Sequence, residues 1–347
     1  MSLFAFAPSR GRRWPLALQA AISIAAPIAV ATMAGQAPLG YIAATGAFTG
    51  LYAGAAPVLD RLRILPFVML GLLASAGLGV LLAGDTVVVG IGVVVLALAS
   101  AAAAFGFRLG PPGPLFFVLV YGLSAHVVAS GAIASGLYLA ALAGGCLFSF
   151  LVACAPLLRR SARAVAARPL RMLLPGPSWN ADARMLLVRV ALVAVVGVLL
   201  GFVIDPERTY WVVGSAVAVI GVAAARRAAF QRGLHRMLGT VVGAGLYLAL
   251  ALLHPPGIWL AVLLGALQFA IELVVVRHYA LALVFITPLV LLLTGAATGT
   301  IGAVDVVGER IVDTLVGAVL GAASGVLHRP AGPPLDGSDS SSTDSAK

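Results

Sequence analysis

Long runs of apolar residues, each about as long as a lipid bilayer is thick, recur along the whole of this sequence. A helix needs roughly 17 to 25 mostly apolar residues to cross the hydrocarbon layer, and runs of about that length are found here. Hydrophobic residues make up 61% of the chain and charged residues 10%, and the mean hydropathy is +1.09. Because a water-soluble domain cannot bury so much apolar surface, the sequence predicts an all-α polytopic membrane protein.

The apolar runs predict about twelve transmembrane helices, six in each half of the chain. The predicted spans of the first half are Leu16–Ala34, Leu39–Ala56, Leu65–Ala83, Val87–Phe107, Leu115–Ile133 and Gly136–Leu158. Those of the second half are Met185–Ile204, Tyr210–Ala225, Leu234–Leu253, Ile258–Val276, Tyr279–Ala297 and Arg310–Leu327. The chain is thereby divided into a membrane region over 1–158, an Arg/Pro-rich cytoplasmic linker over 159–183, a second membrane region over 184–328, and a disordered cytoplasmic tail over 329–347.

The distribution of basic residues predicts which side of the membrane each loop occupies. A net charge of +10 would ordinarily suggest a nucleic-acid partner, but the basic residues lie in short segments beside the apolar runs. Basic residues that flank short loops are retained in the cytoplasm. With both termini cytoplasmic, 19 of the 22 basic residues fall on that side, whereas Arg208 and Arg310 fall outside among acidic residues. We therefore expect a multi-pass protein of the inner (plasma) membrane, with the lipid bilayer and not nucleic acid as its partner. The densest basic cluster, Arg226 to Arg236, is predicted to be a cytoplasmic turn.

The two halves show a weak internal repeat. A shift of about 168 to 172 residues places Gly71 and Ser75 on Gly239 and Gly243, Phe117 on Phe285, and Gly145, Ser149 and Ala153 on Gly317, Gly321 and Gly325. Small residues at every fourth position let helices approach closely in lipid. The repeat therefore predicts two parallel six-helix halves with matching helix contacts. Chance agreement in a chain rich in Gly and Ala is the alternative.

Three short segments resemble the membrane domain of a known family. They are Tyr210-Trp211 at the start of a short span, the pattern RxLGTxxG at Arg236, Gly239, Thr240 and Gly243, and the pattern RxxDTxxG at Arg310, Asp313, Thr314 and Gly317. Over about Met185 to Leu327 the sequence resembles the fusaric acid resistance protein-like family, which is related to aromatic acid exporters and more remotely to aluminium-activated malate channels. The resemblance implies transport, of the export type, of small organic anions such as aromatic carboxylates. The larger exporters carry a sizeable soluble region that has no counterpart in the short linker of this chain.

Polar residues inside the predicted spans are the candidates for substrate or proton sites, because such residues are costly in a membrane. The candidates are Glu272, Asp313, Arg310, His126, Arg189, Tyr210 and Trp211. Glu272 could exchange a proton, or it could pair with Arg277, His278 or a neighbouring helix. His126 could change its charge near neutral pH, or it could be a neutral histidine hydrogen-bonded across helices.

The other candidates also have a structural interpretation. Arg310 and Asp313 lie three residues apart, so they can form an ion pair on one helical face; alternatively, Asp313 is a proton site and Arg310 attracts an anion. Arg189 can extend to the cytoplasmic surface or bind a substrate carboxylate. Tyr210 and Trp211 suit an aromatic anchor at the membrane interface, or the stacking of an aromatic substrate.

The sequence carries no HExxH, CxxC, GxxxxGK[ST] or GxSxG pattern, so we expect no enzyme, no metal and no cofactor. Cys146 and Cys154 are predicted to be packing residues. The energy for uphill transport would then come from an ion gradient or from a separate subunit, and a proton gradient is the simplest choice. Three hypotheses stay open: a proton-driven carrier of organic anions, an anion channel, and a non-transporting scaffold or accessory subunit. A homo-oligomer and an accessory-subunit complex are both compatible with the sequence.

Overall fold

The computed structural model of this chain describes residues 11–221, 225–253 and 255–328. The predicted tail over 329–347 and three of the predicted cytoplasmic charges, Arg10, Arg329 and Lys347, lie outside the described residues. All regular elements within the described ranges are helices, which confirms the predicted all-α class.

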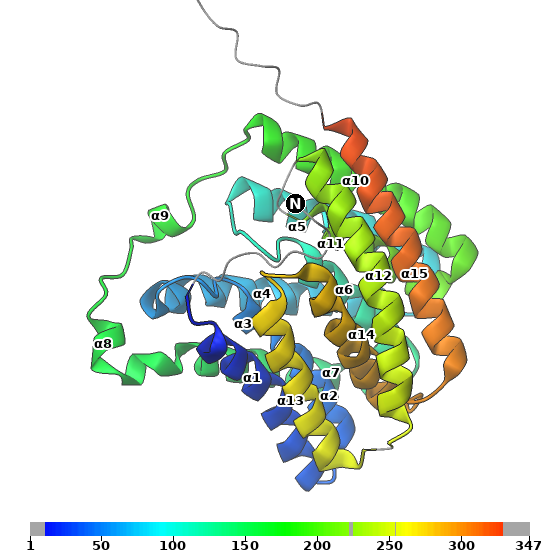
Figure 1. The fold of residues 1–347 in the computed structure, drawn as a ribbon, viewed down its shortest axis with the longest axis horizontal. Helices are drawn as coiled ribbons and strands as arrows, with labels where there is room; N and C mark the ends of the chain where they lie inside the picture. Colours follow the sequence, from blue (N-terminus) through cyan, green and yellow to red (C-terminus); the bar gives the residue numbers. More distant parts are fainter. Residues whose placement is uncertain (1–10, 222–224, 254, 329–347) are drawn as a thin grey trace, which may run out of the picture.

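The helices follow the predicted spans in order (Figure 1). The first half contains α1 (Trp14–Met33), α2 (Ala37–Thr45), α3 (Phe48–Leu51), α4 (Val58–Leu82), α5 (Thr86–Gly106), α6 (Leu115–Ala129), α7 (Ser135–Cys154) and η1 (Ala155–Leu158). The linker carries α8 (Arg160–Arg163) and α9 (Leu170–Leu173). The second half contains α10 (Ala181–Ile204), η2 (Pro206–Arg208), α11 (Thr209–Ile220), α12 (Arg226–Ala251), α13 (Gly257–Val274), α14 (Tyr279–Thr298), α15 (Val304–Ala323) and η3 (Ser324–Leu327).

Nine helices in the described part of the chain are long and apolar enough to cross a membrane, rather than twelve. The predicted span Leu39–Ala56 is broken into α2 and α3, and the predicted span Tyr210–Ala225 is α11, which has 12 residues. The helix α6 has 15 residues. A reason for the early end of α11 is Gly221, whose φ of 56° is a conformation that favours glycine. Arg226 to Arg236 form the first turns of α12, so the prediction of a turn there is wrong.

Contacts between helices occur in matched sets in the two halves. α1 packs on α2 as α10 packs on α11, α4 packs on α6 as α12 packs on α14, and α7 packs on α2 as α15 packs on α11. The contacts across the halves are matched too, because α1 packs on α13 as α10 packs on α5. The first helix of each half, α1 or α10, therefore packs against the other half (Figure 1). This exchange is the arrangement expected of two related halves.

The small residues of the repeat lie at these helix contacts. A Cβ atom added at Gly71 would lie 2.7 Å from the ring of Phe117 on α6, and one added at Gly239 would lie 2.6 Å from the Cβ of Leu283 on α14. Likewise, Gly145 lies against the backbone of Ala43 on α2, and Gly317 lies against the backbone of Val212 on α11. The close helix contacts that the sequence predicted are therefore present. The motif residues Thr240 and Thr314 are buried beside them.

Replacing Gly243 by Ala is expected to lower the free energy of unfolding by about 1 to 3 kcal/mol, as overpacking does. The added methyl would lie 2.8 Å from the Cβ of Thr287 and 2.9 Å from the carbonyl oxygen of Leu283, and backbone cannot move aside easily. Thermal unfolding in detergent measures the effect. Gly245→Ala on the same helix is the control, because a Cβ there meets nothing within 4 Å. Equal unfolding temperatures for the two variants would refute close packing at Gly243.

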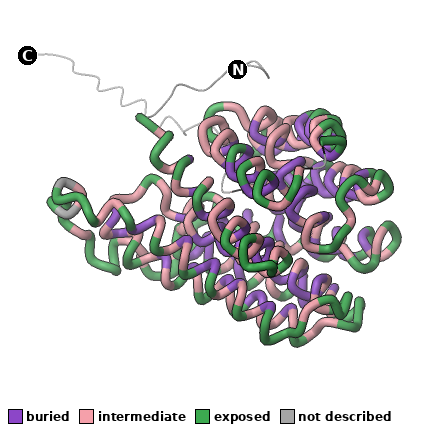
Figure 2. The backbone as a smooth tube through the Cα atoms, turned by 90° about the horizontal axis from the view of Figure 1, so that it is seen from below, coloured by how far each residue is buried: buried purple, intermediate pink, exposed green. Residues whose placement is uncertain are grey.

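Many large apolar side chains are exposed. Buried residues lie mainly where helices face one another, and exposed residues lie mainly on the outer turns (Figure 2). Ile91, Leu199 and Val242, for example, are 59%, 62% and 58% exposed. Such a surface is suited to lipid contact. The linker runs around the outside of the helices (Figure 1) and is held at Asp60 of α4, a fully buried carboxylate that accepts hydrogen bonds from the backbone N and Nε of Arg168 at 2.9 and 2.8 Å.

Candidate functional site

Two cavities lie between the halves, one on each side of a shared group of four residues. The small cavity, of about 180 Å³, is lined by residues of α2, α6, α7, α14 and α15 together with Arg208. The large cavity, of about 760 Å³, extends towards the arginine-rich ends of α1, α12 and α13. Both are lined by Thr45, Leu123, Leu293 and Thr294, which we call the barrier. Leu123 and Leu293 come from α6 and α14, which are counterparts in the two halves.

The two short helices α2 and α11 place equivalent residues beside the cavities. Tyr41 and Thr45 of α2 lie one helical turn apart, as do Trp211 and Ser215 of α11. The two pairs are related by the same shift of about 170 residues. Tyr41 lines the small cavity and Trp211 lines the large one. Short helices that end inside a membrane protein commonly line substrate sites, because their ends can lie only where protein or water surrounds them.

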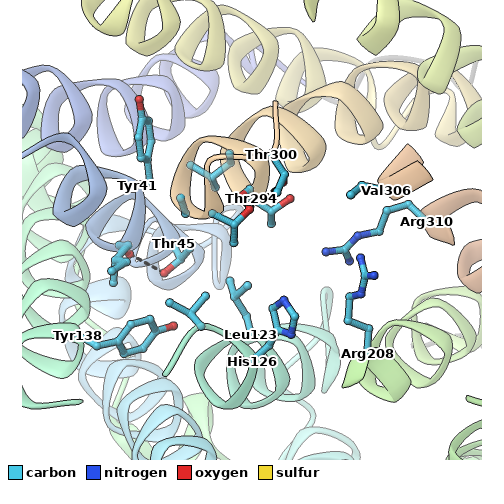
Figure 3. A pocket seen from close by; sticks show the side chains of 15 residues that line it. Tyr41, Thr45, Leu123, His126, Tyr138, Arg208, Thr294, Thr300, Val306 and Arg310 are labelled. Carbon is cyan, nitrogen blue, oxygen red and sulfur yellow. Dashed lines mark hydrogen bonds between the residues drawn. The ribbon is translucent and has the colours of Figure 1, made fainter. Parts of the chain in front are cut away.

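The small cavity is positively charged on one side. Arg208 and Arg310 point into it from η2 and α15, facing His126 of α6 (Figure 3). Arg208 forms ion pairs with Asp205, at 2.6 Å, and with Glu309. Burial lowers the pKa of Arg208, but the two carboxylates raise it by more, so the net change is upward. Arg208 therefore keeps its charge, and this charge is already compensated.

Arg310 is buried, and no described acid lies within ion-pairing distance of it. Its side chain is 7% exposed, its Cζ lies 4.0 Å from the centre of the Trp211 ring, and its Nε and Nη1 atoms have no hydrogen-bond partner. Asp313 is 1% exposed, and neither of its carboxylate oxygens has a hydrogen-bond partner. The predicted ion pair between Arg310 and Asp313 is therefore not formed, because the guanidinium lies instead on the face of Trp211, where a cation–π contact holds it.

Two other interpretations are also wrong, because the residues concerned are buried inside the protein. Tyr210 is fully buried against Gly122 of α6, so it is not an anchor at the membrane interface. Arg189 is fully buried as well, and its Nε donates a hydrogen bond to Ser324 Oγ at 3.1 Å. It does not extend to the cytoplasmic surface, because η3 covers it; it ties α10 to the end of the second half.

Glu272 pairs with a neighbouring helix, as one of its interpretations proposed, and the partner is Arg13 at the start of α1. The Arg13 Nη2 atom lies 3.1 Å from Glu272 Oε2, and its Nε donates to the carbonyl oxygen of Glu272 at 3.0 Å. The pair joins α1 to α13 beside the large cavity.

Replacing Glu272 by Gln is expected to leave proton-dependent transport intact and to lower the free energy of unfolding by no more than about 1 kcal/mol, because the pair is partly exposed. Initial rates of substrate uptake with and without a pH gradient, together with thermal unfolding, measure both effects. Arg13→Gln, which breaks the same pair, should give the same result. A loss of proton dependence in Glu272→Gln alone would make Glu272 a proton site instead.

Several residues at the cavities were not among the sequence candidates. They include Arg208, Tyr41, Thr45, Leu123 and Thr294. The internal repeat would have indicated Tyr41 and Thr45, because a shift of about 170 residues aligns them with Trp211 and Ser215. Cys146 and Cys154 are buried free thiols, and no group of three His, Cys, Asp or Glu in the described ranges could hold a metal ion.

Comparisons with known proteins found one family and one relative that are similar to part of this chain. Residues 177–324 match the model of the family described as fusaric acid resistance protein-like. A stretch of 114 residues, 33% of this chain, is 36% identical to an uncharacterized membrane protein, YvaC, of Bacillus subtilis (strain 168). That stretch covers 18% of the length of YvaC. No solved structure matches this chain.

The matched region contains both motifs and the two arginines of the small cavity, Arg208 and Arg310. It runs from just before α10 to the start of η3, and so includes α11, α12 and α15. Together with the nine apolar helices, the match establishes a multi-pass membrane protein. The match agrees with the resemblance drawn from the sequence: residues 177–324 of this chain are similar to the fusaric acid resistance protein-like family.

Proposed function

We propose that this protein is a secondary transporter that exports small organic anions, with aromatic carboxylates as its substrate class and the proton gradient as its energy source. The observation that carries the proposal is the pair of cavities that share the barrier residues, with the buried Arg310, two of whose nitrogens have no hydrogen-bond partner, at the small cavity. A carrier needs a site that can be reached from each side in turn, and two cavities that meet at the barrier would provide the two approaches.

The charge of the site supports an anionic substrate. A buried guanidinium without a counter-ion is costly, and an oxyanion that bound Arg310 would offset that cost. Tyr41 and Trp211 add aromatic surfaces beside the cavities. The large cavity also has a volume typical of small-molecule sites, which is about 300 to 1,000 Å³. Fusaric acid itself is an aromatic carboxylic acid, in keeping with the name of the matched family.

The buried Asp313 supports coupling to protons. It lies one helical turn from Arg310 on α15, where an unpartnered negative charge is costly and a proton would remove the cost. Binding of an anion at Arg310 and of a proton at Asp313 would then alter the charge of the same small region.

The placement of charges supports an orientation in the inner membrane with both termini cytoplasmic. The large cavity is bordered by Arg13, Arg232 and Arg277, and basic residues are retained on the cytoplasmic side. In this orientation the large cavity receives substrate from the cytoplasm, and the small cavity releases it outside.

Uptake of radiolabelled benzoate into inverted vesicles or proteoliposomes that contain the purified chain tests the proposal. We expect flux that saturates with benzoate concentration and follows the imposed pH gradient. Single-channel current that does not depend on the pH gradient would show that the protein is an anion channel. If benzoate flux does not exceed that of protein-free liposomes, the proposal is wrong. A non-transporting scaffold or accessory subunit is then the remaining hypothesis.

A further inference from the structure

The large cavity carries a group of cations whose charge is not balanced by its own acids. Four arginines, Arg13, Arg232, Arg236 and Arg277, are among its lining residues. Among the described lining residues the single acid is Glu272, and Arg13 already bonds to it. The cavity is therefore electropositive, and at its low-dielectric walls that charge attracts anions more strongly than it would in water.

Arg236 is the arginine best placed to bind a ligand. Its Nη1 donates to the hydroxyl of Tyr279 at 3.1 Å, and its Nη2 donates to Ser215 Oγ at 3.2 Å. Both partners are neutral hydroxyls, and no described carboxylate forms an ion pair with this guanidinium. Its Nε atom is buried and has no hydrogen-bond partner. The side chain is thus held in place from α11 and α14 while its charge and one donor stay available.

An apolar and aromatic wall lies beside this guanidinium. Ser215, its partner, is about one helical turn from Trp211 on the same face of α11, a rise of about 6 Å. Phe116, Leu119 and Ile286 also line the cavity. A cation next to such a wall suits an oxyanion attached to an apolar body.

We infer that Arg236, fixed by Tyr279 and Ser215, forms a second anion site, separate from Arg310 and on the other side of the barrier. Its ligand is a carboxylate or phosphate oxyanion carried on an apolar body, which could belong to a soluble aromatic acid or to a lipid headgroup. Trp211 lies between the two sites, since Arg310 stacks on its ring and Ser215 follows it by one turn. The role of Arg236 in loading substrate from the cytoplasm rests on the proposed function; the existence of the site does not.

Equilibrium binding of radiolabelled benzoate to the full chain in phosphatidylcholine nanodiscs tests the inference. All variants carry Arg310→Gln as well, so that the small cavity does not contribute. We expect Arg236→Gln to weaken binding by about tenfold or more, as the loss of a charge-assisted hydrogen bond does. Arg227→Gln, on the same helix but outside the cavity, should bind like the parent. Unchanged affinity in Arg236→Gln would overturn the inference.

Tyr279→Phe separates the charge from the structural link. It breaks the same Arg236 to Tyr279 hydrogen bond and keeps the guanidinium, so binding should stay within about threefold of the parent. If Tyr279→Phe binds as weakly as Arg236→Gln, Arg236 is only a packing residue and the inference is wrong.

Nanodiscs that contain phosphatidylglycerol identify the source of the oxyanion. If phosphatidylglycerol suppresses benzoate binding only in protein that keeps Arg236, the site is supported and its ligand is a lipid headgroup. If the lipid does not suppress Arg236-dependent benzoate binding, the site is supported and its ligand is a soluble acid. Arg236-dependent binding without any transport in proteoliposomes would overturn the proposed function alone. Transport without Arg236-dependent binding would overturn this inference alone.

Discussion

Replacing Arg310 by Gln is expected to lower benzoate uptake at subsaturating concentration by about 10- to 100-fold without destabilising the protein. A hydrogen bond to a charged group contributes about 1.5 to 3 kcal/mol, and each 1.4 kcal/mol is about a factor of ten in binding. Stability should stay the same or rise, because the variant removes a buried charge that forms no ion pair. Uptake by proteoliposomes and thermal unfolding of the same preparation measure the two effects together.

Two further variants show whether the charge itself acts on substrate. Arg310→Lys keeps the positive charge but not the planar guanidinium on Trp211, so partial uptake is expected. Arg184→Gln, an exposed arginine of α10, should transport like the parent. If Arg310→Gln transports normally, or if it loses transport only because it unfolds, Arg310 does not bind substrate.

Replacing Asp313 by Asn is expected to abolish accumulation driven by the pH gradient while substrate still flows down its own gradient. Asn keeps the size of the side chain and cannot release a proton. For a coupling of one proton per substrate, a gradient of one pH unit supports at most about tenfold accumulation, and the variant should show no more accumulation than protein-free liposomes, into which neutral benzoic acid diffuses. Steady-state benzoate levels in proteoliposomes with an imposed pH gradient and a clamped membrane potential measure the result.

The control for Asp313→Asn is Asp305→Asn, the same change in the exposed first turn of the same helix. It should leave accumulation unchanged. Full accumulation by Asp313→Asn would exclude Asp313 as the proton site.

The sequence predicted the features that depend on local composition and spacing. Apolar runs located the long helices, and small residues at every fourth position located the close contacts of Gly239 and Gly317. The motifs around Arg236 and Arg310 pointed to the family whose model matches residues 177–324. These features were predictable because lipid imposes a minimum helix length and close packing in lipid requires small residues.

The features that depend on neighbours in space were not predictable. Hydropathy cannot distinguish a face turned to lipid from a face turned to protein, so the complete burial of Tyr210 and Arg189 was missed. The spacing of Arg310 and Asp313 allows an ion pair, but Trp211 on another helix takes up the guanidinium. Arg208 was not a candidate because its acidic neighbours in the sequence are typical of an ordinary loop. The fold places its side chain at the small cavity, which the sequence does not indicate.

The close contact between α11 and α6 has a consequence for how the protein is made. Tyr210 of α11 fills the space at Gly122 of α6, and α10 packs on α5, so the family-matched region 177–324 completes its packing on helices synthesised before it. Translated alone, that region would leave the buried faces of α10 and α11 uncovered in the bilayer. We expect it to be degraded, or to assemble with a second copy of itself or with a separately expressed first half. The boundary that sequence comparison draws is therefore not the boundary of the unit that folds.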